Sequence, residues 1–184
     1  MLKVHICLLA LAAVAAIPAG AQNNRTTADR IKQPGSEDSI AREVRHELVL
    51  LPYYGVFDDL GYKVSGSTVT LAGHVTRPTL KTDAENAVKR IEGVGKVDNQ
   101  IAVLPLSPMD DRIRVAEYRA IYGDTVLNRY ALQAVPPIHI IVDNGKVSLV
   151  GVVAAQMDKD VAGARANGVS GVFAVENNLT VDSR

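Results

Sequence analysis

The sequence predicts an α+β protein made of two tandem α-β-β-α-β units, each a three-stranded mixed sheet covered on one face by two helices. The first observation is a repeat: the stretch 69–75 returns as 147–153, with Val, Leu, Gly and Val at matching places. The second is that each copy shows period-two runs followed by a helical stripe. The third is a globular composition, with 47% hydrophobic and 22% charged residues. Two copies are too few for a solenoid, so each unit should have its own core.

The amino terminus has the pattern of a secretory signal peptide. A Lys-containing start precedes an apolar run from Ile6 to Ile17, and Ala19-Gly20-Ala21 matches a cleavage site. The only cysteine, Cys7, lies in this segment, so the mature chain has no disulfide. These features predict a periplasmic protein, secreted through a cleaved signal peptide.

The chain divides by composition and repeat into five parts. They are a signal peptide at 1–21, a flexible polar arm at 22–36, a first unit at 37–104, a linker at 105–109 and a second unit at 110–182. Two prolines make the linker extended and fairly stiff, which predicts a limited range of orientations between the units.

In the first unit, Ser36 is typical of a helix N-cap, and Pro52 ends the helix that follows. Alternating runs then predict a hairpin, a crossover helix and a closing strand at 97–103. This strand should lie parallel to the one before the helix. Gly73 interrupts the alternation, which predicts either a bulge or a close approach of a helix backbone.

The second unit repeats this order with a clearer hairpin. Asn144-Gly145 stands between two apolar runs and favours a type I′ turn. A short extra helix is expected near 125–131, the crossover helix over 156–166 and the closing strand over 173–181.

Few residues indicate chemistry. Equal numbers of basic and acidic residues, 20 of each, argue against nucleic-acid binding. His46, His74 and His139 do not have metal-ligand spacing. The acidic pairs Asp58-Asp59 and Asp110-Asp111 fit helix caps and turns better than catalysis. The sequence therefore predicts no enzyme, cofactor, metal site or small-molecule substrate.

The repeated motif carries a family resemblance. Val69-Thr70-Leu71-Ala72-Gly73, a helix, and Gly93-Val94 leading to Asn99-Gln100-Ile101 resemble the BON domain (bacterial OsmY and nodulation), and the second copy resembles it again. The resemblance implies an α-β-β-α-β fold, a periplasmic or envelope location and no catalytic motif. It implies structural roles for Gly73, Gly93, Asn99, Gly151, Gly171 and Asn177.

Two functions remain open. The resemblance implies binding to phospholipid surfaces, in support of envelope integrity or an osmotic stress response. The alternative is a protein-binding or chaperone-like envelope module whose sheet edges take up extended segments. Because the net charge is near zero, attraction to anionic lipid would need a local patch.

One group of residues is a candidate lipid or partner contact. It combines an aromatic cluster with a basic row on the first crossover helix, interrupted by Glu85: Tyr53, Tyr54, Phe57, Arg77, Lys81, Lys89 and Arg90. The rings either close the end of a small core or form an exposed aromatic surface. The basic row is either a solvated helix face or a phosphate-binding face.

Overall fold

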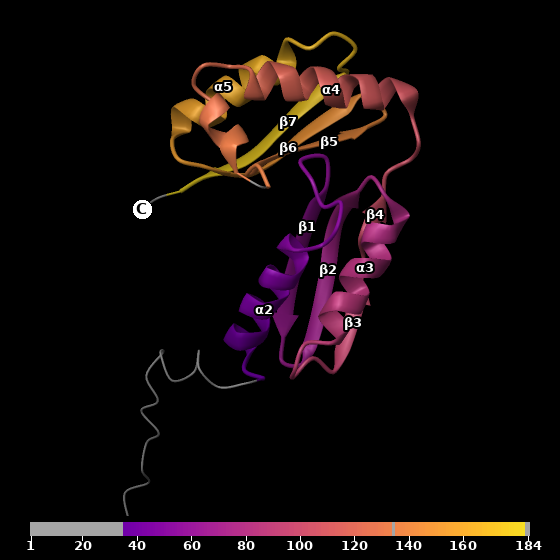
Figure 1. Cartoon of the computed structure of the whole chain (residues 1–184). Helices are drawn as coiled ribbons and strands as arrows, with labels where there is room; N and C mark the ends of the chain where they lie inside the picture. Colours follow the sequence, from indigo (N-terminus) through magenta and orange to yellow (C-terminus); the bar gives the residue numbers. More distant parts are fainter. Residues whose placement is uncertain (1–34, 134, 183–184) are drawn as a thin grey trace, which may run out of the picture.

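The computed structural model describes residues 35–133 and 135–182 and contains two α+β units in tandem (Figure 1). Each unit has the order helix, two strands, helix and closing strand, as the sequence predicts. The segment predicted as a signal peptide and nearly all of the predicted arm lie outside the described residues. Within the described ranges, no helix is long and apolar enough to cross a membrane.

The first unit has a mixed sheet. Its elements are α2 (Glu37–Val49), β1 (Asp59–Ser65), β2 (Thr68–Val75), α3 (Pro78–Lys89), β3 (Lys96–Asn99) and β4 (Ala102–Val103). β1 is antiparallel to β2, whereas β3 and β4 are parallel to it. The closing strand was predicted as one element, but the structure divides it into two short strands, β3 and β4. The Asn99 side-chain oxygen accepts the Ile101 N–H at 3.2 Å, which removes that amide from the ladder.

The second unit repeats the arrangement with one addition. Its elements are α4 (Pro108–Tyr122), the 3-10 helix η1 (Asn128–Leu132), β5 (Ile138–Asp143), β6 (Lys146–Val153), α5 (Gln156–Asn167) and β7 (Ala174–Val181). β5 is antiparallel to β6, and β7 is parallel to it without interruption. Figure 1 shows α4 and α5 on the same face of this sheet.

Local sequence explains where these elements begin and turn. The Ser36 and Ser107 hydroxyls each accept a backbone N–H three residues ahead at 3.2 Å, capping α2 and α4. Asn144 and Gly145 have φ values of 50° and 75°, the positive pair that a type I′ turn requires.

Gly73 and Gly151 mark a tight contact between neighbouring strands. Their φ values are +118° and +132°, and a Cβ at either position would collide with a carbonyl oxygen, that of Asp59 or Pro137. The β1–β2 register continues through Gly73, and Gly151 forms the last pair of the β5–β6 register, with Ile138. In both places the close backbone belongs to the adjacent chain segment. Both alternatives predicted for Gly73, a bulge and an approaching helix, are therefore wrong.

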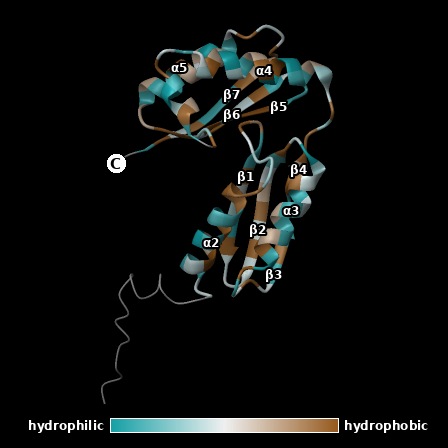
Figure 2. Ribbon diagram, viewed as in Figure 1, coloured by the Kyte–Doolittle hydropathy of each residue, from teal (hydrophilic) through white to brown (hydrophobic). Residues whose placement is uncertain are grey.

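Each unit packs a separate hydrophobic core between its helices and its sheet. Figure 2 shows the hydrophobic residues concentrated on the strands. The core of the first unit draws only on residues between Ile40 and Ile101. The core of the second unit includes Val56, which comes from the loop between α2 and β1. The second core is thus not built from its own unit alone, contrary to the expectation of one independent core per unit.

Candidate functional site

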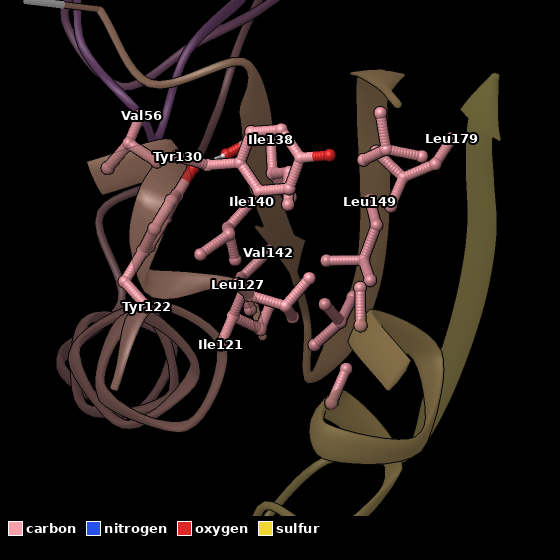
Figure 3. Packing of buried hydrophobic residues seen from close by; sticks show 14 of the residues in the cluster. Val56, Ile121, Tyr122, Leu127, Tyr130, Ile138, Ile140, Val142, Leu149 and Leu179 are labelled. Carbon is pink, nitrogen blue, oxygen red and sulfur yellow. Dashed lines mark hydrogen bonds between the residues drawn. The ribbon is translucent and has the colours of Figure 1, made fainter. Parts of the chain in front are cut away.

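The loop between α2 and β1 joins the two units. The Val56 carbonyl oxygen accepts the Ile140 N–H at 2.8 Å, so the loop covers the outer edge of β5. The Val56 side chain is buried, and Figure 3 shows it on the same side of β5 as Tyr122 and Tyr130. Phe57 makes an edge-on contact with Tyr118, with ring centroids 6.3 Å apart.

The three predicted loop aromatics have different environments. Tyr54 stacks on His139 of β5 at a centroid distance of 5.6 Å. Burial, followed by the nearby charge of Asp59, raises the pKa of Tyr54 to about 12. Phe57 packs against the second core. Only Tyr53 faces solvent, 71% exposed, and the Arg77 guanidinium lies 4.7 Å from its ring centroid.

The predicted basic residues do not form one uniformly basic row. Lys89 forms a 2.5 Å ion pair with Glu85. The hydrogen bond from Lys89, and then that from Asn99, lowers the pKa of the Glu85 carboxyl. Arg90 lines a separate hollow whose other lining residues include three acids, Glu43, Glu47 and Glu92. Among the seven predicted contact residues, the structure directly pairs Tyr53 with Arg77.

The repeated asparagines tie the closing strands to the crossover helices. The Asn99 amide donates to the Lys81 carbonyl oxygen at 2.9 Å, and the Asn177 amide donates to that of Lys159 at 2.7 Å. Gly93 and Gly171, at φ of +91° and +90°, allow the turn that follows each crossover helix.

The acidic pairs hold turns. Asp110 accepts the Asn144 and Gly145 N–H groups at 3.1 and 2.9 Å, which ties the start of α4 to the β5–β6 turn. Asp58 accepts the Gly55 N–H at 3.1 Å and the Thr76 N–H at 2.7 Å. The described residues contain no group of three or more His, Cys, Asp or Glu that could hold a metal ion.

The outer face of α4 is a surface that the sequence interpretation missed. Met109 and Val115 are 57% and 44% exposed, and Leu106, just before the helix, is 97% exposed. Arg112 and Arg119 line a shallow depression together with Val115. Among the described residues neither arginine has an ion-pair partner. Their seven-residue separation was a usable signal, since positions i, i+3 and i+7 share one helix face.

The inner face of α4 contains a second missed residue. Glu117 is fully buried, and neither of its carboxylate oxygens has a hydrogen-bond partner among the described residues. Burial raises the pKa of Glu117 to about 7. The helical pattern alone gave no signal, because a glutamate is normally assigned to the solvent side of a helix.

The solved structures to which this chain is similar include two of a Chlamydia trachomatis protein, both at low overall similarity. The C-terminal domain of CdsD, described as the structural protein of the Type III secretion system, is 13% identical with a TM-score of 0.27, over 77% of this chain and 96% of that one. A second CdsD structure is 14% identical with a TM-score of 0.28, over 79% and 94%. At these TM-scores, the similarity supports no conclusion about this chain. No curated protein matches the sequence.

The family comparison is decisive. The model described as the BON domain matches residues 36–105 and again residues 124–183. The two matches span most of the chain and correspond to the two copies seen in the fold. The chain therefore belongs to the BON domain family and has the domain in tandem.

Proposed function

We propose that this protein is a non-enzymatic periplasmic protein that binds anionic phospholipid surfaces through the outer face of α4. The observation that carries the proposal is the alternation there of exposed apolar side chains with arginines that have no acidic partner among residues 35–133 and 135–182. Its biological role would be to support the envelope, including under osmotic stress.

The chemistry of the face suits a membrane interface. Leu106, Met109 and Val115 would enter the boundary between headgroups and acyl chains, while Arg112 and Arg119 meet phosphates. A guanidinium can donate two hydrogen bonds to one phosphate. The one acid in the depression, Asp111, is paired at 2.6 Å with Arg114, which reduces its repulsion of an anionic surface.

The first helix of the first unit presents a different surface, with its exposed apolar residues, Val49 and Leu50, at its C-terminal end. The exposed part of α2 mixes Arg45 with acids such as Glu37, Asp38 and Glu43. In addition, α4 lies outside both segments that match the family model. The candidate surface thus lies on an element where this chain departs from the family pattern.

Vesicle co-sedimentation of the chain from residue 22 onward tests the proposal. Each arginine should contribute about 1 kcal/mol at an anionic surface, so replacing both Arg112 and Arg119 by Gln should weaken binding roughly thirtyfold. The salt dependence of binding to phosphatidylglycerol vesicles should flatten, and the melting temperature should change little because both side chains are exposed.

The matched control replaces Arg77 and Lys81 by Gln, which removes the same charge from the face predicted from the sequence. If the control loses binding and the α4 variant does not, the lipid face lies on the first unit around Tyr53. Failure of the unmodified chain to sediment with anionic vesicles at low salt would rule out the lipid function.

The second candidate function is protein binding by strand addition at β7. β7 is a continuous edge strand, and Phe173 just before it is largely exposed, whereas the opposite edge of the sheet is covered by Val56. A photo-crosslinking residue at Asn178 or at Arg112 distinguishes the candidates. Strand addition predicts protein adducts at Asn178, and lipid binding predicts lipid adducts at Arg112.

A further inference from the structure

The buried stripe of α4 contains an ionisable group where α2 has an apolar one. On α2 the stripe is Ile40, Val44 and Leu48, and on α4 it is Ile113, Glu117 and Ile121, with the same four-residue spacing. Val44 and Glu117 are both 0% exposed. Glu117 therefore occupies the position that a valine holds in the first unit.

The arginines near Glu117 fall into two groups: Arg112 and Arg119 lie in the depression on the outer face of α4 and have no ion-pair partner among the described residues, whereas the others are engaged with other groups. α4 packs against β5, α5 and η1. On α4 itself, Arg114 donates to the Val142 carbonyl oxygen at 2.7 Å and pairs with Asp111, while its buried Nε has no hydrogen-bond partner among the described residues. On η1, Arg129 pairs with Asp158 of α5 at 2.5 Å.

Among the other ionisable groups on these elements, the buried Nδ1 of His139 has no hydrogen-bond partner within the described residues, and Tyr118 of α4 packs against Tyr122. Arg165 of α5 pairs with Asp124. His139 of β5 stacks on Tyr54, Tyr130 of η1 donates to Asp158, and Tyr122 of α4 donates to the Ile138 carbonyl oxygen. Asp110 accepts two turn amides. Asp143 and Asp160 are exposed, and Lys159 is half-buried. Among the described residues, none of these groups bonds to the Glu117 carboxylate.

Burying an ionised carboxylate without a partner in such a core costs folding free energy, whereas burying the neutral acid costs much less. Ionisation therefore favours any movement that gives the carboxylate access to water. Glu117 is a buried residue of α4, the helix whose outer face is the proposed lipid surface.

We propose that Glu117 is a proton-dependent switch on α4: the neutral carboxyl keeps the helix packed on the sheet, and the ionised carboxylate loosens it and weakens binding to anionic lipid. The lipid part rests on the proposed function, and the packing part does not. The sign follows from the burial-raised pKa. The stabilisation is fully present below pH 4.5, the ordinary value, and is lost as the pH rises through about 7.

Thermal melting of the chain between pH 4.5 and 8 tests the packing part without lipid. The unmodified chain should lose melting temperature across this range, with the ratio of loosened to packed α4 rising by up to about tenfold per pH unit. Glu117→Val, which copies the first unit, and Glu117→Gln should both flatten this dependence. Glu176→Gln, an exposed substitution in the same unit, removes the same charge and should not. All other ionisable groups are the same in the unmodified chain and the Glu117 variants, so their contribution cancels in the comparison.

Carbon-13 NMR of the glutamate carboxyls gives a direct readout, with one resonance titrating near pH 7 that is absent in both Glu117 variants. If no glutamate titrates above pH 6 and the unmodified and Glu117→Val chains melt with the same pH profile, the switch does not exist.

Co-sedimentation with phosphatidylglycerol vesicles tests the lipid part. Glu117→Val should bind as the unmodified chain does at pH 5 and several-fold more tightly at pH 7.5. Equal binding of the two at both pH values would overturn the coupling to lipid. If no variant sediments at any pH, the proposed function fails, while the melting comparison still decides the switch.

Discussion

The two units share one fold but differ in how completely their cores exclude charge. The first unit buries a single charged side chain, Asp58, whereas the second buries Asp110, Arg114, Glu117, Asp124 and Asp158. The first core is self-contained, and the second needs Val56 from its neighbour. The two copies therefore share the arrangement of helices and strands, while the side chains buried beneath their first helices differ. The expected consequence is a less stable second unit whose stability varies more with pH.

The largest effect should come from the two strand glycines. Valine at Gly73 or Gly151 would combine a positive φ with a collision against a neighbouring carbonyl, at a cost of about 4 kcal/mol. Gly151→Val should unfold the second unit and leave the first unit's hydrogen-exchange protection intact. Gly73→Val should affect both units, because it also displaces the loop that carries Val56. If hydrogen-exchange protection is lost in the first unit alone, the second unit does not depend on the contact between Val56 and Ile140.

A smaller effect should follow from Val56→Ala, which shortens a side chain in the second core. The expected loss is about 2 kcal/mol, seen as faster amide exchange in β5 and η1 rather than in the first sheet. Val49→Ala is the control, because Val49 is exposed on the preceding helix. If amide protection is lost in β1 and β2 instead, Val56 contributes to the first core and not to the second.

The smallest effect compares two arginines that each lie over a tyrosine ring. Arg129 lies 5.0 Å from the centroid of Tyr130 and also pairs with buried Asp158, whereas Arg77 lies over Tyr53 and has no ion-pair partner in the described part of the chain. Arg129→Gln should lower the unfolding midpoint of the second unit by more than Arg77→Gln lowers that of the first. Denaturant unfolding of both variants measures the difference. Equal losses would mean that Asp158 is held adequately by its other donors.

Sequence periodicity predicts the fold well because the strand and helix patterns are local and occur twice. The type I′ turn at Asn144-Gly145 and the cap at Ser36 follow from backbone preferences of single residues. The interruption of the first closing strand was missed because it depends on where the Asn99 side chain points. The close contact at Gly73 was assigned to the wrong neighbour, because a glycine in a strand does not reveal which backbone approaches it.

The candidate site was less predictable, since it depends on contacts between units. Tyr54 and Phe57 were grouped with Tyr53 by adjacency, yet their partners, His139 and Tyr118, belong to the other unit. Glu117 lies in a stripe whose flanking members are apolar, and only the packed structure shows that the stripe includes it. Residue type alone could not indicate either arrangement.

The position of Val56 has a consequence for the order of folding. The amino-terminal unit is synthesised first, and its core can close without any later residue. The folded first unit then exposes Val56, whose carbonyl oxygen can accept the Ile140 N–H. β5 can form against this loop as the second unit folds. The first copy thus acts as a template for the second, whereas a chain with the copies in reverse order would begin with the unit that lacks part of its core.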